Sequence, residues 1–140
     1  MREILFRGKR VDNGEWVEGS LILTTAVQQK PYIVDSCWCE CGKVNDEGFA
    51  DFNWLNAFEV IPKTIGQYTG LTDKNGTKIF EGDIIRAFMD FGPAGLLERI
   101  ALVGWHDKYG YQWNYFDTDT IEVIGNINDN PELLKGGVQE

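Results

Sequence analysis

Three cysteines at alternate positions, Cys37, Cys39 and Cys41, have the residue type and spacing closest to a reactive site in this chain. In an extended strand, alternate side chains share one face at intervals of about 6.6 Å. A tetrahedral zinc site needs a fourth ligand, for which the chain offers its single histidine, His106. The cysteine spacing differs from the usual zinc knuckle. The alternative is free thiols without a disulfide, because the cysteine count is odd and we expect a reducing compartment.

His106 and Asp107 could form a general base with an orienting carboxylate, but no motif places a nucleophile beside them. The sequence has no nucleophile elbow, no phosphate-binding glycine loop and no zinc-protease motif. Glu81 and Asp83 form an acidic pair around Gly82, which is typical of a turn. We therefore predict no catalytic residues, no cofactor and no bound metal, and a protein that is not an enzyme.

Aromatic side chains concentrate near residue 110, where alternation places Tyr109, Tyr111, Trp113 and Tyr115 on one face. Such a row could stack nucleic-acid bases, but binding of this kind also needs a positive groove. It could equally be part of the core or of a subunit interface, where Tyr and Trp are enriched. We treat these four residues as the candidate interaction surface.

The charge balance argues against nucleic acid and anionic membranes as partners. The 140 residues include 13 Lys and Arg against 22 Asp and Glu, for a formal net charge of −9. A field of that sign repels phosphate groups and supports solubility. The first residues lack a signal-peptide core, and no run reaches the roughly 20 apolar residues of a membrane helix. We expect a cytoplasmic protein.

Short runs rich in Ile, Val, Trp, Tyr and Phe between 16 glycines predict a mainly β protein. Residues 1–62 are predicted to form an N-terminal hairpin subdomain. Its expected strands are 3–10, 15–23 and 30–38, and Asn13-Gly14 lies in the turn between the first two. Residues 51–58 fit either a short helical turn or an irregular aromatic segment.

Residues 63–135 are predicted to form a second subdomain, although 1–135 could also be one domain. Its expected strands are 65–71, 77–80, 84–89, 99–106, 111–116 and 120–127. We expect 99–106 and 111–116 to pair, and the Gly/Pro segment 91–95 to be a loop at a strand end. Asn130-Pro131-Glu132 predicts the start of a short terminal helix, and 136–140 should be a flexible tail.

The segment from Pro62 to Ile85, PKTIGQYTGLTDKNGTKIFEGDII, closely resembles the YopX family of phage and prophage proteins. The opening Phe6-Arg7-Gly8, the first hairpin and the stretch 121–133 agree with the same family, so the likeness spans nearly the whole chain. The positions that carry it are Gly66, Gln67, Tyr68, Thr69, Gly70, Leu71, Asp73, Asn75, Gly76, Glu81, Gly82, Asp83, Gly125 and Asn126. The three cysteines belong to no motif of the family.

The resemblance implies an uncharacterised phage-encoded protein that forms homo-oligomers, and it supplies no catalytic residues. The order of motifs from Gly82-Asp83 to Val103-Gly104-Trp105 is similar to SH3-like small barrels, a likeness of fold that carries no function. We therefore expect a β-rich α+β fold of antiparallel hairpins, with an SH3-like barrel in the C-terminal half and one short helix.

Three functional hypotheses follow. The first is a non-enzymatic accessory protein that acts in the cytoplasm of the host bacterium by binding a host or phage protein. The second is a small nucleic-acid-binding β-barrel that uses the aromatic face. The third is a metal or thiol enzyme at the three cysteines.

Overall fold

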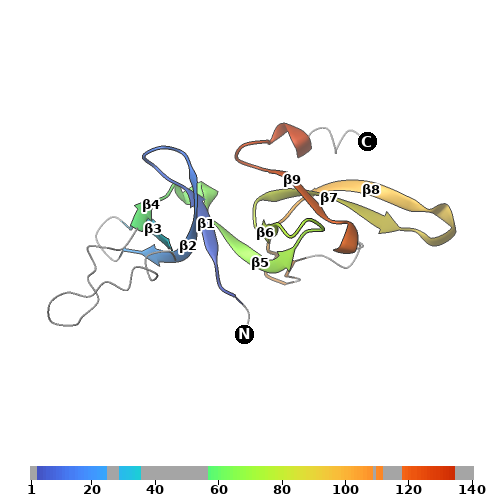
Figure 1. The fold of residues 1–140 in the computed structure, drawn as a ribbon, viewed down its shortest axis with the longest axis horizontal. Helices are drawn as coiled ribbons and strands as arrows, with labels where there is room; N and C mark the ends of the chain where they lie inside the picture. Colours follow the sequence, from blue (N-terminus) through green and yellow to red (C-terminus); the bar gives the residue numbers. More distant parts are fainter. Residues whose placement is uncertain (1–2, 25–28, 36–56, 109, 112–117, 135–140) are drawn as a thin grey trace. The chain divides into compact units, whose positions relative to one another are not determined.

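Antiparallel strands make up most of the structure, a computed structural model that describes residues 3–24, 29–35, 57–108, 110–111 and 118–134 (Figure 1). The mainly β fold built from antiparallel hairpins is confirmed. The chain divides into two compact units, an N-terminal unit (Ile4–Gln67) and a C-terminal unit (Tyr68–Glu140 with Met1–Glu3). Within the described ranges, no helix has the length and apolar character needed to cross a membrane.

The N-terminal unit is an antiparallel sheet in the order β4-β3-β2-β1. Its elements are β1 (Phe6–Lys9), β2 (Trp16–Leu23), β3 (Pro31–Asp35), β4 (Ala57–Glu59) and the 3-10 helix η3 (Pro62–Thr64). The predicted first hairpin is confirmed as β1 and β2, with Gly14 at a φ of 73° in the turn. Val17, Ile33 and Val60 are buried together at the centre of this unit.

β4 corrects one prediction, because Ala57 and Phe58 had been expected in a helical turn or an irregular segment. Phe58 instead lies opposite Ile33 in the strand pair β3–β4 and packs against the buried cluster around Ile33. A helical turn could not give Ala57 and Phe58 these cross-strand partners. Residues 51–56 of the same prediction lie outside the described residues.

The strand β5 (Gly66–Thr72) pairs with β1 through its first residues and with β6 (Lys78–Phe80) through Tyr68 and Thr72. This second hairpin is confirmed. The other elements of the C-terminal unit are β7 (Asp83–Asp90), η4 (Gly92–Ala94), β8 (Leu96–Leu102), η5 (Thr118–Thr120) and β9 (Glu122–Asn126). They form a three-stranded sheet in the order β8-β7-β9. The SH3-like barrel stays a prediction.

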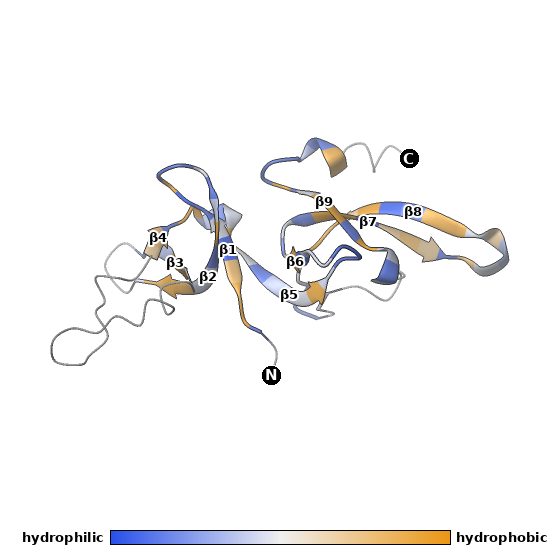
Figure 2. Ribbon diagram, viewed as in Figure 1, coloured by the Kyte–Doolittle hydropathy of each residue, from blue (hydrophilic) through white to orange (hydrophobic). Residues whose placement is uncertain are grey.

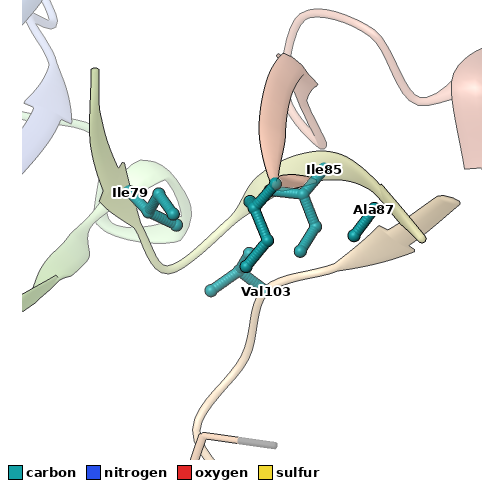
Figure 3. Packing of buried hydrophobic residues seen from close by; sticks show 5 residues of the cluster. Ile79, Ile85, Ala87 and Val103 are labelled. Carbon is teal, nitrogen blue, oxygen red and sulfur yellow. The ribbon is translucent and has the colours of Figure 1, made fainter. Parts of the chain in front are cut away.

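The core of the C-terminal unit is aliphatic. Ile79 on β6, Ile85 and Ala87 on β7, and Val103 after β8 converge on one cluster (Figure 3), which also contains Ile121. All five are buried, with at most 5 % of their surface exposed. The cluster therefore holds the hairpin β5–β6 against the three-stranded sheet.

The strand predicted at 99–106 begins earlier, at Leu96, ends at Leu102, and pairs with β7; its predicted pairing with 111–116 stays a prediction. The segment Phe91–Gly95 is the turn of this hairpin, closed by the N–H of Phe91 donating to the Gly95 carbonyl at 3.0 Å. Gly92 and Gly95 have φ values of 67° and 91°, which only glycine adopts easily. Tyr111 is not in a strand, and 112–116 lie outside the described residues.

The predicted terminal helix is confirmed at Glu132–Leu134, where the described part of it ends. Asn130 does not cap this helix in the expected way. Its Oδ1 accepts the backbone N–H of Asn126, at 3.3 Å, and so ties the helix start to the end of β9. The predicted tail, 136–140, lies outside the described residues.

Candidate interaction surface

The turn after β5 is organised by the carboxylate of Asp73, which is buried. Its Oδ1 accepts the N–H groups of Asn75 and Thr77, each at 2.9 Å. Its Oδ2 accepts the N–H of Val123 in β9, at 3.0 Å. Burial alone would raise the pKa of Asp73, but three backbone hydrogen bonds and the charge of Lys74 hold that pKa below its ordinary value of 3.8. Asp73 therefore joins the turn to β9.

The corner Glu81-Gly82-Asp83 is also structural. Asp83 is 1 % exposed, and its Oδ2 accepts the N–H of Phe80 at 2.8 Å. Gly82 has a φ of 91° and donates its N–H to the Val103 carbonyl. The two acids of this corner therefore have different roles. Asp83 is a buried structural carboxylate, and Glu81 accepts a hydrogen bond from the Tyr111 hydroxyl.

The remaining motif positions of β5 serve the same architecture. The Thr69 hydroxyl donates to the Ile79 carbonyl at 2.8 Å, and the Tyr68 ring lies 5.6 Å from that of Phe80. Gly70 has a φ of 91°. Gly66 and Gln67 pair with β1, and the N–H of Leu71 donates to the Thr69 hydroxyl oxygen at 3.3 Å. The family segment Pro62–Ile85 therefore has a structural role, and it does not indicate where an interaction surface lies.

Of the predicted aromatic row, only Tyr111 is among the described residues; Tyr109, Trp113 and Tyr115 lie outside them. The Tyr111 ring meets Trp105 edge to face, with centroids 5.0 Å apart, and packs against the aliphatic core. Its hydroxyl donates to the Glu81 carboxylate. Contacts with the core and the hydrogen bond to Glu81 therefore fix the position of Tyr111. Trp105, in contrast, is 57 % exposed.

His106 lies in an exposed tight turn with Gly110, and its Nδ1 accepts the N–H of Lys108 at 3.1 Å. This bond gives the histidine a role in the turn. Cys37, Cys39 and Cys41 lie outside the described residues, so their predicted role as thiols or ligands stays a prediction. In the ranges that the structure describes, no three His, Cys, Asp or Glu side chains are grouped in a way that could hold a metal ion.

Sequence reasoning missed the surface that the structure makes most conspicuous, the hairpin β7–β8. β9 pairs with β7 only from Asp83 to Arg86, whereas β8 follows β7 as far as Asp90. The hairpin therefore projects beyond β9 (Figure 1). In Figure 2 both of its strands carry stretches of hydrophobic colour, with a hydrophilic stretch in the middle of β8. Its exposed large apolar side chains are Phe91, Leu96, Leu97 and Leu102.

The outer backbone edge of β8 can be located from the register. Bonds join Val103 to Asp83 and Phe91 to Gly95, at the two ends of the hairpin. Because bonded pairs alternate along an antiparallel ladder, every second residue of β8 directs its N–H and C=O away from β7. These residues are Leu96, Glu98, Ile100 and Leu102. Among the described strands, β8 pairs with β7 alone.

An ionic cluster covers one face of the sheet next to this edge. The Arg86 guanidinium contacts the carboxylate of Glu122 on β9 and lies 3.7 Å from that of Glu98 on β8. Lys74 lies 3.9 Å from Glu122. These side chains are partly exposed, so we assign them a small contribution to stability. Their effect on the surface is to neutralise the charges beside β8.

A signal for this edge was present in the sequence. The run from Leu96 to Leu102 reads LLERIAL, with apolar residues on both faces of the strand and one acid beside one base. A half-buried strand would alternate between polar and apolar residues. Apolar residues on both faces indicate a strand that is covered on both sides.

Comparison with known proteins supplies the lineage. Residues 5–135 match the family described as YopX protein. The structure is similar to the crystal structure of protein EF1440 from Enterococcus faecalis, with a TM-score of 0.55 and 25 % sequence identity over 96 % of this chain and 99 % of that one. A comparison with curated proteins finds no match. The family match spans nearly the whole length, from before β1 to the terminal helix, and the chain therefore belongs to the YopX family.

Proposed function

We propose that this chain is a non-enzymatic, homo-oligomeric accessory protein of a phage or prophage, which acts in the cytoplasm of the host bacterium by binding a host or phage protein. The observation that supports this proposal is the exposed apolar surface of β8. Large exposed apolar patches on soluble proteins often mark sites of association with other proteins. Here Leu96 is 61 % exposed and Leu97 is 44 % exposed.

Self-association is tested by light scattering coupled to size-exclusion chromatography. We expect the wild type to exceed the mass of one 15.9 kDa chain at micromolar concentration. The double variant L96S/L97S should dissociate about tenfold more readily, because a few apolar anchors carry most of the energy of an interface. Leu23→Ser is the matched control, since Leu23 is 56 % exposed in the N-terminal unit. A wild type that stays monomeric across this range would remove self-assembly from the proposal.

Binding to another protein is tested with the same variants as bait. We expect a protein of the host or phage to be retained from a lysate of infected cells by the wild type and by Leu23→Ser, and to be lost with L96S/L97S. Equal retention by all three baits would place the binding surface away from β8.

Nucleic-acid binding is the alternative function, and the surroundings of Tyr111 argue against it. The carboxylate of Glu81 accepts the Tyr111 hydroxyl hydrogen, which places an acid where a phosphate backbone would need a cation. We expect no shift of single-stranded DNA or RNA in gels at low salt. A shift that weakens as salt rises would favour the alternative, because contacts with phosphates release counterions.

A further inference from the structure

The chain contains two Asn-Gly pairs, Asn13-Gly14 in the turn between β1 and β2 and Asn75-Gly76 in the turn between β5 and β6. Both pairs are exposed, and both glycines have a positive φ. A glycine after asparagine leaves its main-chain nitrogen accessible to the asparagine side chain, because glycine has no Cβ to obstruct the approach. Each turn is therefore a candidate for spontaneous deamidation, and the two turns differ in their hydrogen bonds.

Deamidation needs no catalyst and no reactant except water. The main-chain nitrogen of the glycine gives up its proton to solvent and forms a bond to Cγ of the asparagine, and the Cγ–Nδ2 bond breaks with release of ammonia. Water then opens the resulting succinimide ring. Opening at Cγ gives aspartate, and opening at the main-chain carbonyl carbon gives isoaspartate, in which the chain continues through the side-chain carbons. Nothing is oxidised or reduced, and the chain gains one negative charge.

A hydrogen bond holds the Asn13 side chain close to the nitrogen that would attack it. Its Oδ1 accepts the N–H of Glu15 at 2.9 Å. This bond closes a small ring that contains both reacting atoms, Cγ of Asn13 and the nitrogen of Gly14. The bond also draws electrons toward Oδ1, which makes Cγ a better electrophile. Holding two reacting groups together in this way raises the rate of an intramolecular step.

The Asn75 side chain lacks the corresponding bond. In this turn the acceptor is the carboxylate of Asp73, which binds the N–H groups of Asn75 and Thr77, each at 2.9 Å. Within the ranges that the structure describes, no hydrogen bond holds the side-chain amide of Asn75. Its Cγ can therefore rotate away from the nitrogen of Gly76.

The two turns also differ in how readily they open. The N–H groups of Gly14 and Gly76 each donate to a carbonyl of their own turn at 3.0 Å, so each turn has to open before its nitrogen can attack. The turn at Asn75 is anchored to β9 through Asp73. In the described structure, the hydrogen bonds of residues 12–14 stay within residues 10–15. Fewer bonds therefore oppose local opening at Asn13.

We propose that Asn13 is a site of spontaneous deamidation in the folded protein and that Asn75, although it has the same neighbour, is protected. The product carries one negative charge more than the −9 of the unmodified chain. The new carboxylate belongs to a turn in which Asp12 already binds the Arg10 guanidinium at 2.6 Å. Isoaspartate also lengthens the main chain inside this turn, so the end of the β1–β2 hairpin changes in charge and in shape as the protein ages.

Peptide mapping by mass spectrometry tests the proposal on the wild type. The protein is kept for days at mildly alkaline pH, and the fraction of each site that has gained about 1 Da is followed. In the folded protein we expect Asn13 to react at least about fivefold faster than Asn75. In guanidinium chloride the two rates should agree within about threefold, because the turns are then unfolded. A ratio in the folded protein that does not exceed the ratio in guanidinium chloride would overturn the proposal.

A matched pair of variants checks the assignment in the mass of the intact protein. Asn13→Gln should remove most of the mass gain, because glutamine has to close a larger ring and reacts more slowly. Asn75→Gln should leave the gain nearly unchanged. Circular dichroism checks that both variants fold. The opposite pattern, or an equal loss of the gain in both variants, would show that Asn13 is not the preferred site.

Discussion

Replacing Asp73 with alanine is expected to lower the free energy of unfolding by about 3–5 kcal/mol, since removing the acceptor of a buried hydrogen bond costs about 1–3 kcal/mol and Asp73 accepts three. The affected N–H groups belong to the turn and to β9, so both should loosen together. A total stability of about 5–15 kcal/mol would leave such a variant close to unfolding. Urea denaturation followed by tryptophan fluorescence measures the loss.

The control for this variant is Asp90→Ala. Asp90 also accepts a turn N–H, that of Gly92 at 2.8 Å, but it is exposed and water can replace it. We expect a loss of about 1 kcal/mol or less there. Similar losses for the two variants would contradict the role given to Asp73.

The same carboxylate predicts a dependence on pH. Its pKa in the folded protein lies below the ordinary value of 3.8, so the ionised form stabilises the fold above that pH. This contribution is lost as pH falls through the folded pKa. The difference in unfolding free energy between wild type and Asp73→Asn should therefore be constant near neutral pH and shrink below about pH 4. A difference that stays constant to about pH 3 would contradict this assignment.

Gly125→Ala is expected to cost about 2 kcal/mol, because the added methyl group has no room. Its Cβ would lie 2.7 Å from Oδ1 of Asn130 and 2.9 Å from a methyl carbon of Leu133. The terminal helix would have to move away from β9, and the bond between Asn130 and Asn126 would be lost. Thermal unfolding by calorimetry measures the change.

Gly104→Ala is the matched control, since no atom outside its chain neighbours lies within 4 Å of the position of its Cβ. We expect its stability to stay within about 0.5 kcal/mol of the wild type. A Gly125 variant as stable as the Gly104 variant would show that the helix start does not pack on β9 as described.

Local signals predicted the hairpins well. Asn-Gly turns and alternating apolar residues identified β1–β2 and β5–β6, because both features act over a few residues. The family resemblance could be read from the same stretches. The Gly/Pro segment Phe91–Gly95 was correctly predicted as a loop at a strand end, but the strand after it was predicted at 99–106, whereas β8 runs from Leu96 to Leu102 and pairs with β7.

The candidate site was harder to predict because exposure is a property of the assembled sheet. LLERIAL has the composition of a buried strand, and only the strand order β8-β7-β9 shows that β8 lies at the edge of the described part of the sheet. The aromatic row drew attention by residue type, yet Tyr111 packs against the core. The sequence shows the chemical type of each side chain. It does not show which strands pair, because strand pairing depends on contacts between residues that are distant in the sequence.

The hydrogen bond from Val123 to Asp73 also limits how the protein can assemble. It occupies the outer side of β9 with a side chain, and the N–H of Lys74 adds a second bond there, to the Ile121 carbonyl. Another strand therefore cannot pair with β9 on this side at this point. An assembly of several chains would have to use a surface other than this side of β9.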